Sequence, residues 1–402
     1  MYHIIDGSIC APNGFLANGV HVGVRKNPNK LDLALIFSEV PCVSAGVFTT
    51  NKAKAAPVIV TQEKLKKDSV QAIIINSGNA NACTGELGLL HANQMANKTA
   101  LKLNIDPSKV AVASTGVIGV TLPIDKILTG IDKVTEKLEQ NSLAAANAIM
   151  TTDTFSKTIA IELKICGKKV KIGGMAKGSG MIHPNMATML GFITTDISIS
   201  KELLQYTLSK INDDTFNMIT VDGETSTNDM VMILANGLAK NPEITSQEDP
   251  DWKIFYKGLK FVCQFLSIEI AKDGEGATKL IEVNVINAKH LNQAKIAART
   301  ICGSPLVKSA VHGEDANWGR IVNALGYSGI DLDLNKLSVS LGEINLFTEG
   351  VAIQFDENRA KEFLKQKTVQ INVNLGLGTK NATAWGCDLT HGYVDINASY
   401  RT

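Results

Sequence analysis

The feature that most constrains the fold is the alternation of short strand-like segments with longer helix-like segments along the chain. Residues 20–61 favour strands, because VHVGVR, DLALIFS and VSAGVFTT are rich in β-branched side chains and partly alternate. QAIIIN then predicts a buried strand, and the apolar spacing of three and four in residues 87–103 predicts a helix. Such alternation is typical of mixed α/β proteins.

The alternation continues to the C-terminus. We expect further strands at 110–119, 158–163, 170–173, near Met218, and at IEVNVIN after Lys279. We expect further helices from Pro123, and at 144–150, 201–212, 226–236 and 251–270. A length of 402 residues favours two domains, which we place at 1–280, a larger α/β domain, and 281–402, a smaller α/β domain.

Charge and hydropathy exclude several classes of partner. Forty basic and 39 acidic side chains leave a net charge of +1, so neither nucleic acid nor an anionic membrane surface is an expected partner. The longest apolar stretch, residues 230–235, is too short to span a bilayer. The start, MYHIIDGSIC, lacks the cationic and apolar segments of a signal peptide, so we expect an unexported protein.

Cysteine and histidine spacing predicts no metal site. The seven cysteines form no CxxC pair, and we expect them to be reduced and mostly buried. The seven histidines never pair at metal-binding spacing on one element. HExxH, GxSxG, GxxxxGK[ST] and GxGxxG are all absent, which removes the commonest hydrolase and nucleotide-binding signatures.

The strongest local signal is a glycine-rich loop, GGMAKGSGMIHPNMA, that leads into the strand-like TMLGFITTD. The junction between Ala187 and Thr188 suits self-cleavage, because a threonine at a new chain start can use its own α-amine as base. An α-amine pKa of about 7.7–8.0 suits that task near neutrality. The hydroxyl would attack the Ala187 carbonyl, and water would open the ester to give residues 1–187 and 188–402. A plain glycine-rich turn before a buried strand is the alternative.

KGSGMIHPNMATML closely resembles the self-cleavage motif of the bifunctional ornithine acetyltransferase and glutamate N-acetyltransferase family, the ArgJ family. The resemblance extends over nearly the whole chain, through INSGNANACTG, ASTGVIG, IMTTDT, TVDGETSTND, AKDGEGATK, ICGSPLVKSAVHGEDANWGRI and DINASYRT. It implies a self-processing N-terminal-nucleophile acetyltransferase fold (ArgJ/DmpA-like). It also implies a ping-pong reaction in which Thr188 takes an acetyl group from N-acetyl-L-ornithine and passes it to L-glutamate in arginine synthesis.

The resemblance also assigns site residues. Thr115 and Gly116 in ASTGVIG match the oxyanion positions, where a hydroxyl and a backbone N–H would face the tetrahedral oxygen. The substrate positions are Thr154, Lys177 on the glycine-rich loop, Thr188, Glu275, Asn397 and Thr402. Glu275 suits the cation of ornithine, and Asn397 and Thr402 require an ordered C-terminal tail.

The resemblance further implies no cofactor, small-molecule substrates, a cytoplasmic location and a heterotetramer of two chains of each piece. It leaves open whether acetyl-CoA also serves as donor. Two alternatives remain at this point. One is an N-terminal-threonine hydrolase or aminopeptidase of related fold, and the other is a non-enzymatic protein whose glycine-rich loop binds an anion.

Overall fold

β-Sheets form the framework of the part of the chain that the computed structural model describes, residues 2–67, 69–183 and 189–399. The first sheet contains, in spatial order, β1 (Tyr2–Ile4), β7 (Lys157–Ile165), β8 (Lys168–Lys177), β9 (Leu190–Thr195), β11 (Met230–Ala235) and β4 (Val43–Phe48). The second contains β2 (Phe15–Val20), β3 (Leu33–Ser38), β5 (Ala72–Asn79) and β6 (Val110–Val117). The third contains β10 (Ile219–Thr220), β17 (Lys380–Cys387), β12 (Leu280–Ala288), β16 (Thr368–Asn374), β13 (Ser338–Leu341), β14 (Ile344–Thr348) and β15 (Val351–Ala352).

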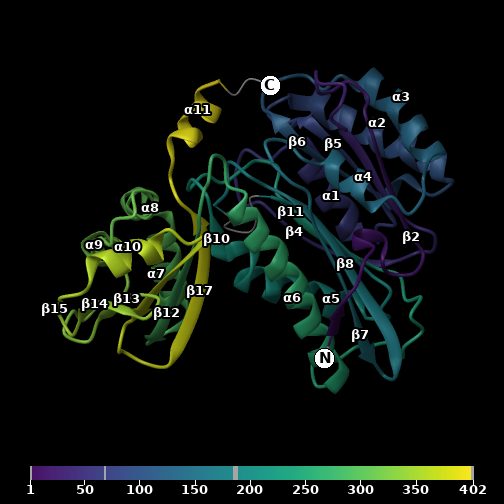
Figure 1. Cartoon of the computed structure of the whole chain (residues 1–402). Helices are drawn as coiled ribbons and strands as arrows, with labels where there is room; N and C mark the ends of the chain where they lie inside the picture. The colour runs from purple at the N-terminus through teal and green to yellow at the C-terminus, as the bar shows by residue number, and fades with distance from the viewer. Residues whose placement is uncertain (1, 68, 184–188, 400–402) are drawn as a thin grey trace.

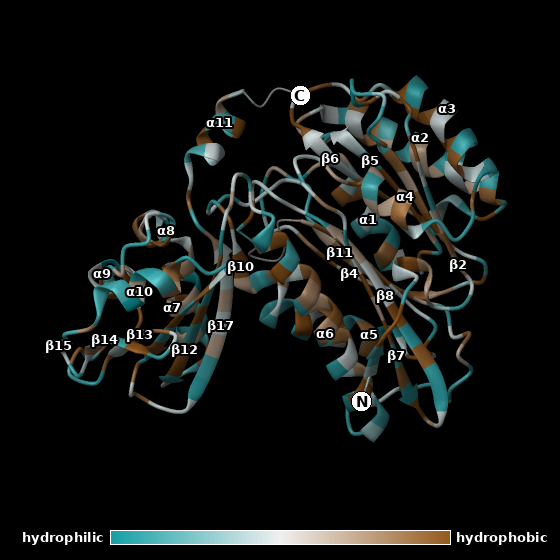
Figure 2. Cartoon of the chain, in the orientation of Figure 1, coloured by the Kyte–Doolittle hydropathy of each residue, from teal (hydrophilic) through white to brown (hydrophobic). Residues whose placement is uncertain are grey.

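Helices cover the faces of these sheets. One face of the second sheet packs against α1 (Ala56–Lys67), α2 (Gly85–Leu103) and α3 (Ile124–Glu136), and its other face meets α4 (Ser142–Ala148) and the first sheet. The opposite face of the first sheet packs against α5 (Lys201–Asp214) and α6 (Pro250–Lys272), which lie between the first and third sheets (Figure 1). The remaining helices belong to the C-terminal part: α7 (Leu291–Gly303), α8 (Pro305–His312), α9 (Trp318–Tyr327), α10 (Glu357–Leu364) and α11 (His391–Ser399). Hydrophobic residues concentrate along the strands and on the helix faces turned toward them (Figure 2). The predicted mixed α/β class is confirmed.

The two long helices beside the first sheet begin where the sequence predicts. The Ser200 hydroxyl accepts a hydrogen bond from the Leu203 N–H at the start of α5. The Asp249 carboxylate accepts one from the Asp251 N–H at the start of α6, where Pro250 occupies the first helical turn. These caps satisfy N–H groups that have no partner within the helix.

The helix predicted at 226–236 is wrong, because the chain forms β11 there. All six residues of β11 are buried, and the strand pairs in parallel with β9 and antiparallel to β4. A continuously apolar run has no period, so it fits a strand buried on both faces as well as a buried helix. The Ser226 hydroxyl accepts a hydrogen bond from the Asn228 N–H in the preceding turn and caps no helix.

The strand-rich interpretation of residues 20–61 is partly wrong. β3 and β4 form as expected, but β2 ends at Val20 and α1 begins at Ala56. The Asp32 carboxylate, fully buried, accepts hydrogen bonds from the backbone N–H groups of Val22, Gly23 and Arg25. This side chain therefore folds VHVGVR into a turn instead of a sheet ladder.

Strand register brings distant residues together at one end of the first and second sheets. Lys177, the last residue of β8, pairs with Leu190, the first residue of β9, and Leu190 pairs with Met230. In the second sheet, Ser77 of β5 lies opposite Thr115 of β6. Of these residues, Lys177, Leu190 and Thr115 line the site described below.

The boundary predicted at residue 280 falls at the first residue of β12, and β12 and the later strands build the third sheet. That sheet also includes β10 from earlier in the chain, paired in parallel with β17. The division into two domains stays a prediction. Among the described residues, no helix combines the length and the apolar character needed to cross a bilayer.

Candidate functional site

A cavity of about 110 Å³ lies where the C-terminal ends of β6 and β8 meet the starts of β9 and β11. Five of the residues predicted for the site from the sequence line it: Thr115, Gly116, Lys177, Glu275 and Asn397. Met189 and Leu190, which follow the predicted cleavage point in the chain, line it as well. Ala187, Thr188 and Thr402 lie outside the described residues.

Lys177 is the last residue of β8. The prediction that it lies on the glycine-rich loop is therefore wrong. Its side chain is buried, and its Nζ donates a hydrogen bond to the Thr115 Oγ1 at 3.3 Å. Burial lowers the pKa of Lys177, whereas the carboxylate of Asp153 acts in the opposite direction. The structure therefore holds this lysine in a dry position where its proton is easier to lose than in water.

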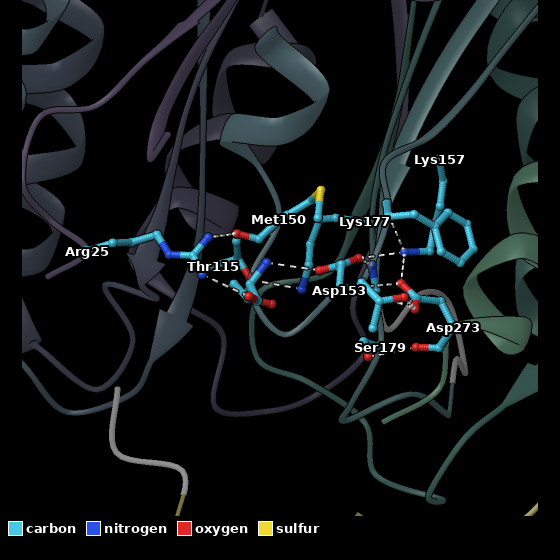
Figure 3. Close-up of polar contacts among 12 residues, drawn as sticks. Arg25, Thr115, Met150, Asp153, Lys157, Lys177, Ser179 and Asp273 are labelled. Carbon is cyan, nitrogen blue, oxygen red and sulfur yellow. Dashed lines mark hydrogen bonds and ion pairs between the residues drawn. The ribbon is translucent and has the colours of Figure 1, made fainter. Parts of the chain in front are cut away.

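A buried charge cluster of Lys157, Asp153 and Asp273 lies next to Lys177 (Figure 3). The Lys157 Nζ donates to Asp153 Oδ1 at 2.8 Å and to Asp273 Oδ2 at 2.6 Å. Burial by itself would raise the pKa of Asp153, but the ammonium groups of Lys157 and Lys177 outweigh it and hold that pKa well below its usual range. Asp153 is therefore an ionised carboxylate between two lysines.

Asp153 also connects two walls of the cavity through backbone contacts. Its Oδ1 accepts the Gly178 N–H at 2.7 Å, next to Lys177, and its Oδ2 accepts the Thr151 N–H at 2.9 Å. Arg25 holds the same wall from the other side, donating to the carbonyl oxygens of Met150 and Thr151 at 2.8 and 2.9 Å. Figure 3 shows these contacts in one row between the first and second sheets.

Thr154 does not line the cavity. Its backbone N–H donates to Asp273 Oδ2 at 3.0 Å, and its hydroxyl donates to Asp273 Oδ1. Thr151 and Thr152 of the same IMTTDT segment line the cavity instead. The sequence interpretation missed these two residues, although they belong to a motif that it singled out.

Thr115 and Gly116 lie at the end of β6, where the strands come unusually close. Gly116 has φ +134°, and a Cβ atom there would lie 2.3 Å from the Gly78 carbonyl carbon. Only glycine fits this position. The close approach leaves the Thr115 hydroxyl at the cavity, where the Lys177 ammonium donates to it.

Glu275 forms the wall contributed by the turn after α6. Its backbone N–H donates to the Ser179 carbonyl at 3.0 Å, and its Oε2 accepts the Asn397 Nδ2 at 2.8 Å. Asn397 belongs to α11, so the structure describes this part of the C-terminal tail as an ordered helix. A Cβ at Gly180 would lie 2.2 Å from the Glu275 Oε2, which explains the small residue facing the carboxylate.

Asp229 is a lining residue that the sequence interpretation missed. Its side chain is 3% exposed, and burial raises the pKa of its carboxyl well above the usual value. Its Oδ2 has no hydrogen-bond partner among the described residues. Asp229 directly precedes β11, a position that becomes visible only once 230–235 is known to be a strand.

Acids, a buried lysine and a strand-end hydroxyl thus face one small cavity, a set suited to acyl or proton transfer. Among the described residues, no group of three or more histidine, cysteine or acidic side chains could hold a metal ion.

Comparisons with known proteins give a consistent picture. The ArgJ family model matches residues 16–402. The arginine biosynthesis bifunctional protein ArgJ of Caldanaerobacter subterraneus subsp. tengcongensis is 52% identical over 404 residues, covering 99% of this chain and 100% of that relative. The protein of the same description from Staphylococcus aureus (strain COL) is 52% identical over 401 residues, covering 99% and 96%. The solved structure of the Bacillus halodurans arginine biosynthesis bifunctional protein argJ is 49% identical, with a TM-score of 0.52, and covers 53% of this chain and 100% of that one.

Proposed function

The chain belongs to the ArgJ family, and from that premise we propose that it moves an acetyl group from N-acetyl-L-ornithine to L-glutamate through an acetyl-Thr188 intermediate. It is an enzyme of arginine biosynthesis, a glutamate N-acetyltransferase. The observation that carries the proposal is the convergence on one cavity of Thr115, Gly116, Lys177, Glu275 and Asn397, which come from distant parts of the chain.

Self-cleavage prepares the nucleophile. The Thr188 hydroxyl attacks the Ala187 carbonyl carbon, the C–N bond breaks to give an ester, and water hydrolyses the ester. The products are a carboxylate at Ala187 and an α-amine at Thr188. Met189, bonded to Thr188 in the chain, lines the cavity, which supports this assignment. The match to the solved Bacillus halodurans chain covers all of that chain and 53% of this one. Residues 188–402 likewise make up about 53% of this chain, as a solved chain that is the second piece alone would require.

Acetyl transfer then proceeds in two half-reactions. The α-amine of Thr188 takes the hydroxyl proton as the oxygen attacks the acetyl carbonyl, and ornithine leaves with that proton. L-Glutamate attacks the acetyl ester by the same route in reverse. The Thr115 hydroxyl and the Gly116 N–H stabilise the oxyanion, while Glu275 binds the cation of ornithine. The buried Lys177 ammonium faces the same space and favours negative charge there.

We extend the proposal in three respects. The enzyme works in the cytoplasm, in keeping with the biosynthetic role of its relatives. It assembles as two copies of each piece. It also uses acetyl-CoA as a second acetyl donor, in keeping with the bifunctional description of those relatives.

Mass spectrometry and an acetyl-transfer assay test the proposal together. We expect purified protein to contain two pieces, 1–187 and 188–402, and to convert labelled glutamate into labelled N-acetylglutamate when N-acetylornithine is present. Release of free acetate at a rate independent of glutamate would identify a hydrolase instead. A single intact chain that transfers acetyl groups at full rate would overturn the mechanism.

Replacing Thr115 by valine should lower kcat while changing KM little. Valine keeps the shape of the side chain but removes the hydroxyl donor, and loss of one oxyanion donor costs about 10²–10³ in kcat. Ser114→Ala is the matched control, because it also removes a hydroxyl from β6. The Ser114 hydroxyl donates a hydrogen bond to Asn76 Oδ1, and Ser114 does not line the cavity. A Thr115→Val enzyme with wild-type kcat would remove Thr115 from the oxyanion site.

A further inference from the structure

A second cavity, of about 700 Å³, opens beside His183. One wall is a single face of α7, formed by residues spaced three and four apart that include Lys295, Ile296 and Arg299. Asp213 and Met218 also line the cavity. His183 itself lines the cavity, and it is four residues before Ala187 in the chain.

Arg299 fixes the charge state of His183. Its Nη2 lies 2.9 Å from the His183 Nε2, and because a guanidinium can only donate, that nitrogen must accept. The His183 Nδ1 then carries the proton and donates to the Thr220 Oγ1 at 3.0 Å. Burial, together with the charge of Arg299, lowers the pKa of His183 to about 4. The histidine is therefore neutral near pH 7.

Arg299 is the cation of this cavity that lacks a counter-ion among the described residues. Lys295 is paired with Asp214 at 2.7 Å, and the Asp213 carboxylate accepts a hydrogen bond from Asn217 at 3.0 Å. Within the described residues, Arg299 makes no ion pair, and its Nε is buried with no hydrogen-bond partner. A half-buried guanidinium without an anion favours a carboxylate ligand, which it can bind through two N–H groups.

The proposed self-cleavage creates such a carboxylate nearby. Hydrolysis of the ester leaves Ala187 as the end of the first piece, and the four residues after His183 can reach at most about 14 Å. That tail, Pro184-Asn185-Met186-Ala187, carries three apolar side chains besides its terminal charge. The cavity offers matching apolar surface, since Tyr327 is 59% and Ile296 is 36% exposed at its edge.

We propose that this cavity is the docking site of the new C-terminus, residues 184–187, with the Ala187 carboxylate bound to Arg299. The inference rests on the proposed self-cleavage. Docking removes the cut end from the catalytic cavity and leaves room there for N-acetylornithine.

Carboxypeptidase digestion of the cut enzyme tests the docking site. The protease would remove Ala187, Met186 and Asn185 from an accessible tail, and mass spectrometry of the first piece follows each loss. We expect the wild-type tail to be trimmed about tenfold or more slowly than the tail of Arg299→Gln. Glutamine can still donate to His183, so this change removes the charge and keeps that contact. Arg299→Lys should restore part of the protection.

Two further variants secure the interpretation. Lys289→Gln removes an exposed cation just before α7 and should be trimmed like the wild type. Ile296→Glu, at an exposed position of the same cavity, supplies a competing carboxylate and should speed trimming even if Arg299→Gln folds poorly. If the enzyme is cut but the tail of the first piece is trimmed equally fast in wild type and Arg299→Gln, the docking site alone is overturned. A chain that stays whole would overturn self-cleavage and, with it, the docking site.

Discussion

Thr188→Ala should leave the protein as one chain of 43.0 kDa and reduce acetyl transfer by at least about 10³-fold. The reason is that, in the proposed mechanism, one hydroxyl performs both reactions. Alanine cannot attack the Ala187 carbonyl, so no α-amine is released, and it cannot carry the acetyl group either. Intact-mass measurement reports the first effect, and the labelled-glutamate assay reports the second.

Thr188→Ser is the matched control for this experiment. Serine keeps the hydroxyl and loses only a methyl group, so we expect it to cut and to transfer acetyl groups, both more slowly than the wild type. If Thr188→Ala is still cut before residue 188, another group opens that peptide bond. If it stays whole but transfers acetyl groups at the wild-type rate, Thr188 is not the nucleophile.

The second large effect concerns stability. Asp153→Ala should lower the free energy of unfolding at pH 7 by about 3–5 kcal/mol, the usual cost of removing one partner from a buried ion pair. The change leaves the ammonium groups of Lys157 and Lys177 with one carboxylate fewer in a dry site, and it leaves the Thr151 and Gly178 N–H groups without their acceptor. Urea unfolding followed by circular dichroism measures the difference.

Asp132→Ala is the matched control, because Asp132 also pairs with two lysines, Lys98 and Lys102, each at 2.9 Å, but at the surface. Water screens that site, so the unfolding midpoint should change little. Equal effects of the two substitutions would show that burial does not set the strength of the Asp153 cluster.

The Asp153 effect should depend on pH with a definite sign. The folded-state pKa of Asp153 lies below its value in the unfolded chain, about 3.9, because of the two lysines. Its contribution is therefore fully present above the unfolded pKa and is lost as pH falls toward the folded pKa. The difference in unfolding free energy between wild type and Asp153→Ala should shrink below about pH 4.

Periodic segments were predictable from sequence, and aperiodic ones were not. The apolar residues of α2 recur at helical spacing, and IEVNVIN alternates as β12 does, so both elements are confirmed. MVMILA has no period, and only its place between β9 and β4 makes it a strand. VHVGVR has strand composition, but the buried Asp32 carboxylate takes its N–H groups into a turn.

The sequence by itself determined the α/β class, the family and five residues that line the cavity at the ends of β6 and β8, because motifs and local periodicity involve residues that are close together in the sequence. Only the tertiary structure decided which side chains each of them touches. Thr154 donates a hydrogen bond to Asp273, which is 119 positions away in the sequence, and Arg299 donates one to His183, which is 116 positions away. Burial, ion pairing and pKa depend on such distant partners, which register and packing bring together and which no local pattern records.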